Sequence, residues 1–216
     1  GAHFAQVKSR RHPSMKPFLV GTKGRQEIID LVKTSAQLEA AKGAMATIAK
    51  EGKTVLFVGG KVEIATLVKK ASQEIGAPYV AARWLGGTIS NWNEIKKRVD
   101  RLAELTEKSA AGTLVKQHTK LELVKLEREK KRLEDRLDGI TTLVKRPDAL
   151  LVVDTKHERH AVKEARDAGI PVIAIMSSDC DLNDAAYPIV ANDTSRETVR
   201  LILAELAEAF QKGQAA

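Results

Sequence analysis

The segment Arg83-Trp84-Leu85-Gly86-Gly87-Thr88 combines residue types that suit contact with nucleic acid. Adjacent glycines let backbone N–H groups approach a phosphate, arginine makes bidentate contacts with phosphate oxygens, and an indole offers a flat stacking face. Both tryptophans of the chain, Trp84 and Trp92, fall in this region, close to the cations Lys96, Lys97 and Arg98. The alternative is that Trp84 fills a core and the two glycines only turn the chain.

A second glycine pair, Gly59-Gly60-Lys61, follows a strand-like run and precedes a helix-like one. The N-terminus of a helix can hold a phosphate there. The segment does not match a P-loop, because Val55 stands where a glycine is required and Val62 where Ser or Thr is required. We therefore favour an ordinary strand–helix turn over a phosphate site, and we expect no cofactor.

Metal and catalytic sites have weak support in the sequence. His157 and His160 lie one helical turn apart and could meet Cys180 or Asp181 at neighbouring strand ends, but a single thiol does not make a zinc pattern. Aspartates also cluster at the presumed strand ends, without a nucleophile motif or HExxH beside them. These aspartates are Asp154, Asp179, Asp181 and Asp184. We expect them to cap helices and turns, and we expect no metal, no catalytic residue and no enzyme activity.

The charge of the chain favours a polyanionic partner. Its 216 residues carry a formal net charge of +8, and the sequence pI is about 9.5. Residues 1–33 hold seven lysines and arginines but two acidic residues. Phe4, Met15, Phe18 and Leu19 are spaced among these charges, which favours a docked basic segment over a solvated terminus.

Cysteine content and hydropathy restrict the class of protein. Cys180 is the single cysteine, so an intramolecular disulfide is excluded and a reducing compartment is expected. No apolar stretch approaches the roughly 20 residues of a membrane span, and no signal-peptide pattern opens the chain. We expect a soluble, cytoplasmic protein.

Short apolar runs bounded by turn residues alternate with helix-period segments. The expected strands are Thr54–Val58, Tyr79–Ala82, Ala149–Val153, Pro171–Met176 and Ile189–Ala191. The expected helices span 34–50, 62–75, 158–168 and 195–211. Thr34, Thr119, Thr155 and Thr194 each precede Gln or Glu by three residues, which is the capping-box spacing. Because the strands are apolar without strict alternation, we expect a parallel α/β sheet with helices on both faces.

Two long polar helices, at 89–109 and 119–140, interrupt this alternation, with Ala110-Ala111-Gly112 between them. Their apolar residues step by three and four, as in Trp92, Ile95, Val99 and Leu102, and again from Leu123 to Ile140. The narrow stripe predicts an antiparallel coiled-coil hairpin that projects from the sheet. The alternative is two helices lying flat on the sheet. The expected division is a basic segment (1–33), a sheet domain (34–88 and 147–216) and a hairpin insertion (89–146).

Sequence blocks over nearly the whole chain occur in a family-specific order. They include Arg10-Arg11-His12-Pro13, Val55-Leu56-Phe57-Val58-Gly59, Arg83-Trp84-Leu85-Gly86-Gly87-Thr88, Pro147-Asp148-Ala149-Leu150 and Gly169-Ile170-Pro171-Val172. In these blocks the chain resembles the S-two family of bacterial small-subunit ribosomal proteins. It departs from the family at Ala5-Gln6 and Leu182, and because it begins almost at His3-Phe4 we expect it to lack the short helix that precedes this position in the family.

The resemblance implies a flavodoxin-like sheet, an inserted coiled-coil hairpin and a structural, non-catalytic role in the small ribosomal subunit. The implied partners are rRNA and neighbouring small-subunit proteins, including the large one that captures mRNA, with no membrane partner and no homo-oligomer. The rRNA-binding role carries over to a basic arm and to the segment from Arg83 to Arg98. The residues are Arg10, Arg11, Lys16, Lys23, Arg25, Arg83, Trp84, Gly86, Gly87, Thr88, Asn91, Lys96, Lys97 and Arg98.

Two other classes of function stay open beside this one. A nucleotide- or phosphate-using enzyme could place its site at Gly59-Gly60-Lys61 and the strand-end aspartates, because the same fold serves many chemistries. A coiled-coil adaptor would instead bind protein through residues 89–140. Nucleotide binding that is lost in Lys61→Ala would favour the first class. Loss of function with retained RNA binding after deletion of the hairpin would favour the second.

Overall fold

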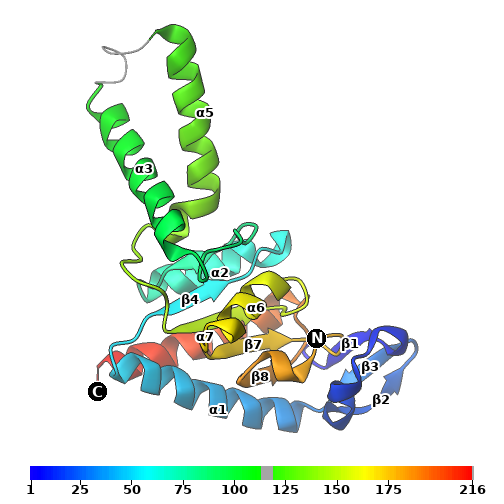
Figure 1. Cartoon of the computed structure of the whole chain (residues 1–216). Coiled ribbons are helices and arrows are strands. Elements are labelled where there is room, and N and C mark those ends of the chain that lie inside the picture. Colours follow the sequence, from blue (N-terminus) through cyan, green and yellow to red (C-terminus); the bar gives the residue numbers. More distant parts are fainter. Residues whose placement is uncertain (113–118, 216) are drawn as a thin grey trace.

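The computed structural model describes residues 1–112 and 119–215, and its centre is a five-stranded parallel sheet (Figure 1). The strand order is β5-β4-β6-β7-β8. In sequence order this is 2-1-3-4-5, the flavodoxin-like arrangement, so the predicted fold class is confirmed. The strands are β4 (Val55–Val58), β5 (Tyr79–Val80), β6 (Ala149–Val153), β7 (Val172–Met176) and β8 (Tyr187–Val190).

Alternate residues of the strands point into two separate cores. Phe57 and Leu151 pack beneath a layer of three helices, α1 (Leu31–Lys50), α2 (Val62–Glu74) and α7 (Arg196–Gln214). Leu56 and Leu150 face the opposite side, which α6 (Arg159–Asp167) covers together with the base of the hairpin. Because both faces are buried, strands β4, β6 and β7 are apolar throughout, as the sequence indicated.

Residues 1–30 form a small lobe, whereas residues 31–33 of the predicted basic segment belong to helix α1. The three strands of the lobe make an antiparallel sheet of order β1-β3-β2, which the sequence analysis did not predict. The lobe contacts the end of β7, since Gln6 N donates to Ser178 Oγ (3.2 Å) and His12 N donates to Ser178 O. Its elements are β1 (Phe4–Val7), η1 (Lys8–Arg10), η2 (Pro13–Phe18), β2 (Leu19–Lys23) and β3 (Gln26–Ile29).

The hairpin projects from the sheet domain, as the apolar residues spaced by three and four predicted (Figure 1). Helix α3 (Trp92–Ala110) buries Ile95, Val99, Leu102 and Leu105 on one stripe. Helix α5 (Lys120–Leu137) runs back beside it and ends in the turn η3 (Asp138–Ile140). The predicted connection at Ala110-Ala111-Gly112 continues into residues 113–118, which lie outside the described residues.

The base of the hairpin is fixed to the edge strand β5. Tyr79 Oη donates to Asp138 Oδ2 (2.8 Å), and Lys69 Nζ reaches the same carboxylate at 3.5 Å. A Cβ atom at Gly139 would lie 2.1 Å from Tyr79 O, so only glycine permits this approach. The hairpin therefore leaves the sheet in one defined direction. Within residues 1–112 and 119–215, no helix has the length and apolar character needed to cross a membrane.

Candidate nucleic-acid interface

The loop from Arg83 to Asn91 is organised by a carboxylate from α6. Glu164 lies about 75 to 80 positions away in sequence, and its two oxygens accept hydrogen bonds from backbone and side-chain donors of the loop. The donors are Trp84 Nε1 (3.1 Å), Gly87 N (2.8 Å), Ile89 N (3.0 Å), Ser90 N (3.2 Å) and Ser90 Oγ (3.2 Å). Desolvation raises the pKa of Glu164, but these hydrogen bonds outweigh it and hold the pKa below its ordinary value. The loop is therefore held in shape by an ionised carboxylate of α6.

Trp84 does not present a stacking face. Its side chain is 7% exposed and belongs to the core beneath α6, and its only polar atom is bonded to Glu164. Trp92 is also buried, at 6% exposure. The interpretation of the indole as a platform for a base is wrong in this structure, and the alternative of a core residue is confirmed. The reason is that Glu164 supplies the partner an indole N–H needs when buried.

The backbone of the glycine pair is likewise engaged inside the protein. Gly87 has φ +93°, which favours glycine, and its N–H points to Glu164 instead of outward. Thr88 is buried at 2% exposure, and its hydroxyl donates to Leu85 O (2.7 Å). Gly86 is exposed, with open space where a Cβ atom would be. Of these three residues, Gly86 is the most exposed, Gly87 is partly exposed and Thr88 is buried.

The charged residues of this region lie on the outside. Arg83, Asn91, Lys96, Lys97 and Arg98 are all exposed, and Lys97 Nζ pairs with Glu94 Oε1 at 2.6 Å. Arg83, Lys96 and Arg98 make no ion pair within the described residues. The loop and the start of α3 thus place their cations at the surface, while Trp84 and the Gly87 N–H hold the loop in shape.

The turn at Gly59-Gly60-Lys61 is also bonded to a carboxylate of the protein. Gly60 N donates to Glu158 Oε1 (2.9 Å), and Glu158 is 3% exposed. A Cβ atom at Gly60 would lie 2.7 Å from Ala82 O and 3.0 Å from that carboxylate oxygen. The Gly60 N–H, which a phosphate at this turn would use, is therefore already bonded to a side chain of the protein.

Beside this turn, Lys61 lies among buried acids at the carboxyl ends of the strands. Its ammonium group pairs with Asp154 and, at 3.4 Å, with Asp193, and atoms of Asp154, Asp193 and Cys180 lie within 4.8 Å of one another. Although desolvation lowers the pKa of Lys61, the two carboxylates raise it above its ordinary value. The Lys61 ammonium group is therefore the cation that neutralises the acids of this cluster.

Burial shifts the pKa of two groups in this cluster strongly. It raises the pKa of Asp193 to about 6 and the pKa of the Cys180 thiol to about 12. Asp193 Oδ1 is buried with no hydrogen-bond partner among the described residues. Neither candidate histidine belongs to the cluster, because His157 Nδ1 bonds Glu158 (2.7 Å) and both histidines line a separate pocket of about 330 Å³ with Arg83.

The basic residues of the N-terminal lobe divide into two groups. Arg11 Nη1 pairs with Glu27 Oε1 at 2.8 Å, and Glu27 is 2% exposed, so Arg11 neutralises a buried acid. Arg10, Lys16, Lys23 and Arg25 are exposed and make no ion pair within the described residues. This lobe adjoins β8 through Asn192 N, which donates to Ala2 O, whereas the Arg83 loop follows β5 at the opposite sheet edge. The structure therefore separates the predicted residues into two surfaces.

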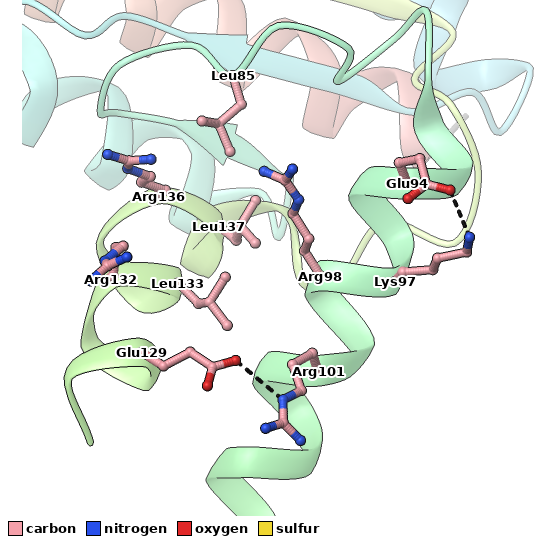
Figure 2. Close-up of a pocket in the computed structure, with 10 residues that line it drawn as sticks. All are labelled: Leu85, Glu94, Lys97, Arg98, Arg101, Glu129, Arg132, Leu133, Arg136 and Leu137. Atoms are coloured by element: carbon pink, nitrogen blue, oxygen red, sulfur yellow. Dashed lines mark hydrogen bonds and ion pairs between the residues drawn. The ribbon is translucent and has the colours of Figure 1, made fainter. Parts of the chain in front are cut away.

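Two arginines of α5 were absent from the sequence prediction. Arg132 and Arg136 line a pocket with Arg98 of the predicted set, between the two hairpin helices (Figure 2). Their spacing of four residues, which places them on one helical face, is the signal in the sequence that could have indicated them.

Comparison with known proteins gives one consistent result. The family model described as Ribosomal protein S2 matches residues 1–213. A small ribosomal subunit protein uS2c from Rhodomonas salina is 39% identical over 213 residues, which cover 99% of this chain and 87% of the relative. The uS2 proteins of Wolinella succinogenes and Kocuria rhizophila are 40% and 38% identical, with 100% and 99% of this chain and 79% and 75% of each relative covered.

Proposed function

The chain belongs to the ribosomal protein S2 family, and we propose that it serves as a structural constituent of the small ribosomal subunit by binding rRNA through two basic surfaces. The arm surface comprises Arg10, Lys16, Lys23 and Arg25 of the N-terminal lobe. The loop surface comprises Arg83, Gly86, Asn91, Lys96, Lys97 and Arg98. Members of this family are structural, so the proposal involves no reaction.

The observation that carries the proposal is the lack of internal partners for most of these cations. Of the eight lysines and arginines on the two surfaces, only Lys97 makes an ion pair within the described residues. Exposed cations without carboxylate partners are free to neutralise phosphates and release counterions, which is the main source of affinity for RNA. Arg11, Trp84, Gly87 and Thr88 then act indirectly, because they hold the lobe and the loop in shape.

The experiment is co-sedimentation of the purified chain with small subunits stripped of this protein, over a salt series. We expect saturable binding that weakens steeply with salt. In Arg10→Ala/Arg25→Ala the slope of log affinity against log salt should fall by about 2, since about 0.9 is lost per phosphate contact. The charge-matched control is Lys70→Ala/Arg196→Ala, which removes exposed cations of the α1, α2 and α7 layer.

Arg11 is unsuitable for this test because its removal leaves Glu27 buried without its partner. No binding of the unaltered chain at low salt would contradict the proposal. Equal loss in the arm variant and in the control would show that net charge, and not the arm surface, governs binding.

We also infer contact with neighbouring small-subunit proteins, including the large one that captures mRNA. Support comes from membership of a family of small-subunit proteins, and the exposed apolar side chains Val32 (80%) and Val62 (87%) provide the test positions. Val32→Asp and Val62→Asp should leave binding to protein-free rRNA unchanged while they reduce retention of neighbouring proteins in reconstituted subunits. Unchanged protein content in those subunits would reject this part of the proposal.

A further inference from the structure

The base of the hairpin contains a pocket of about 400 Å³ between α3 and α5. Figure 2 shows Arg98 of α3 on one side and Arg132 and Arg136 of α5 on the other, with Leu133 and Leu137 between them. Leu85, from the loop after β5, closes the end near the sheet. The pocket thus has a charged rim and an apolar floor.

The pocket has an excess of positive charge. Its two carboxylates are already paired, Glu94 with Lys97 at 2.6 Å and Glu129 with Arg101 at 3.3 Å (Figure 2). Arg98, Arg132 and Arg136 make no ion pair or hydrogen bond within the described residues. Three like charges around one pocket repel one another, so an anionic group between them would be bound favourably.

The residue types restrict the ligand further. Guanidinium groups bind phosphate oxygens through paired N–H donors and also stack on the planes of bases, which the ammonium group of lysine does not do. The partly exposed Leu133 and Leu85 offer apolar contact that a bare phosphate would not use. A paired duplex shows mainly its backbone, whereas an unpaired nucleotide presents a phosphate and a base together.

We propose that this arginine pocket binds an unpaired RNA nucleotide, with its phosphate on Arg132 and Arg136 and its base against Leu133 and the plane of Arg98. The inference rests on the proposed rRNA-binding function and adds α5 to the RNA-contacting surface. An acidic protein segment would satisfy the same charges but makes less use of the planar arginines and the apolar floor. The experiment separates these two occupants.

The test uses the full chain with protein-free small-subunit rRNA and with stripped subunits. Arg132→Ala/Arg136→Ala should weaken binding to both by about tenfold or more. Arg128→Ala/Lys131→Ala is the matched control, since it removes two exposed, unpaired charges of the same helix outside the pocket, and it should change affinity less than threefold. Arg132→Lys/Arg136→Lys keeps the charge but loses the planar groups, so most of the loss should remain.

Chemical probing of 2′-hydroxyl reactivity then identifies the nucleotide. One or a few unpaired positions should change reactivity when the unaltered chain binds, and should return to their free reactivity in Arg132→Lys/Arg136→Lys. A loss of affinity confined to subunits and absent with protein-free rRNA would overturn the proposal in favour of a protein occupant. Full retention by the alanine variant, with loss in the arm variant, would reject the pocket and leave rRNA binding intact. Failure of the unaltered chain to bind would instead reject the proposed function.

Discussion

The two glycine turns and the arginine pocket differ in the source of their negative charge. At Gly60 and Gly87 the backbone N–H groups are met by Glu158 and Glu164, which belong to the start and the middle of α6. In the arginine pocket, Arg132 and Arg136 have no such partner within the described residues. A glycine-rich turn that looks suited to phosphate can therefore be satisfied internally, whereas the unpaired arginines of the pocket keep the positive charge on which its proposed RNA contact rests.

The largest expected effect follows removal of Glu164, the carboxylate that bonds the Gly87 turn. Glu164→Ala leaves several loop donors without a partner, so the free energy of unfolding should fall by about 3 kcal/mol or more. Urea denaturation at pH 7 measures this, with the exposed Glu127→Ala as a control that should stay within about 0.5 kcal/mol.

The pH dependence adds a second readout. Since the pKa of Glu164 is lowered in the folded chain, its contribution is present above the ordinary pKa and is lost as the pH falls through the folded value. The difference between the unaltered chain and the variant should therefore shrink in acid. An equal midpoint for both proteins at pH 7 would mean that the loop does not depend on Glu164.

Asp193, which lies beside the Gly60 turn, should show the opposite pH dependence. Burial raises the pKa of Asp193 to about 6, so the folded state binds this proton more tightly than the unfolded chain. Its contribution is present below the ordinary pKa near 3.8 and is lost as the pH rises through about 6. Relative to Asp193→Asn, the unaltered chain should lose about 2 kcal/mol between pH 4 and pH 7. Parallel pH profiles of unfolding free energy would contradict this.

A third comparison separates the two glycine pairs. Gly60→Ala places a methyl group against Ala82 O and Glu158, so we expect a loss of about 2 kcal/mol. Gly86→Ala meets open space and should stay within about 0.5 kcal/mol. Thermal or urea denaturation of both variants checks the difference. Equal stability of the two would show that the Gly60 turn can move away from the added methyl group.

The smallest effect is expected in the arginine pocket itself. Arg132→Ala/Arg136→Ala removes two exposed charges that have no internal partner, so the free energy of unfolding should change by less than about 0.5 kcal/mol. The measurement is urea denaturation of the free chain. A clear loss of stability would indicate that these side chains support the hairpin, and would weaken their assignment to a ligand.

The sheet was predictable because burial on both faces leaves continuous apolar runs such as Ala149–Val153, which the structure reproduces as β6. The hairpin was predictable because its seam repeats every three and four residues. The three-stranded lobe was missed because its strands are short and mostly exposed or half-exposed, so their pattern resembles a polar segment. A strand of four or five residues shows the alternation of apolar and polar residues at too few positions to distinguish it from a polar segment.

Helix starts show how a local signal can be overridden. The capping box at Thr119 and Glu122 is confirmed. The one predicted at Thr34 is wrong, because α1 begins at Leu31 with Asp30 as its cap, and Thr34 Oγ1 donates instead to Val190 O (2.6 Å). The Thr34 hydroxyl bonds a carbonyl of β8 that is 156 positions away in sequence, and local residue spacing cannot predict such a partner.

The candidate site was predictable in its charges but not in its exposure. Arg83, Lys96 and Arg98 are exposed, as their residue types indicate. The burial of Trp84 depends on Glu164, and the pairing of Arg11 depends on the burial of Glu27. Such pairings arise only once the chain is folded, so residue type alone does not distinguish a cation that supports the fold from one that is free for a partner.

The sheet domain supports both the arm surface and the loop surface. The lobe is joined to it through Ser178 and Asn192, and the loop is joined to it through Glu164 of α6. Under the proposed function, binding of one surface would hold the other near its own RNA site at a high effective concentration, and the second attachment would become intramolecular. Avidity of this kind would let two modest contacts retain the protein, and it would select RNA in which both sites have already been brought to the matching distance.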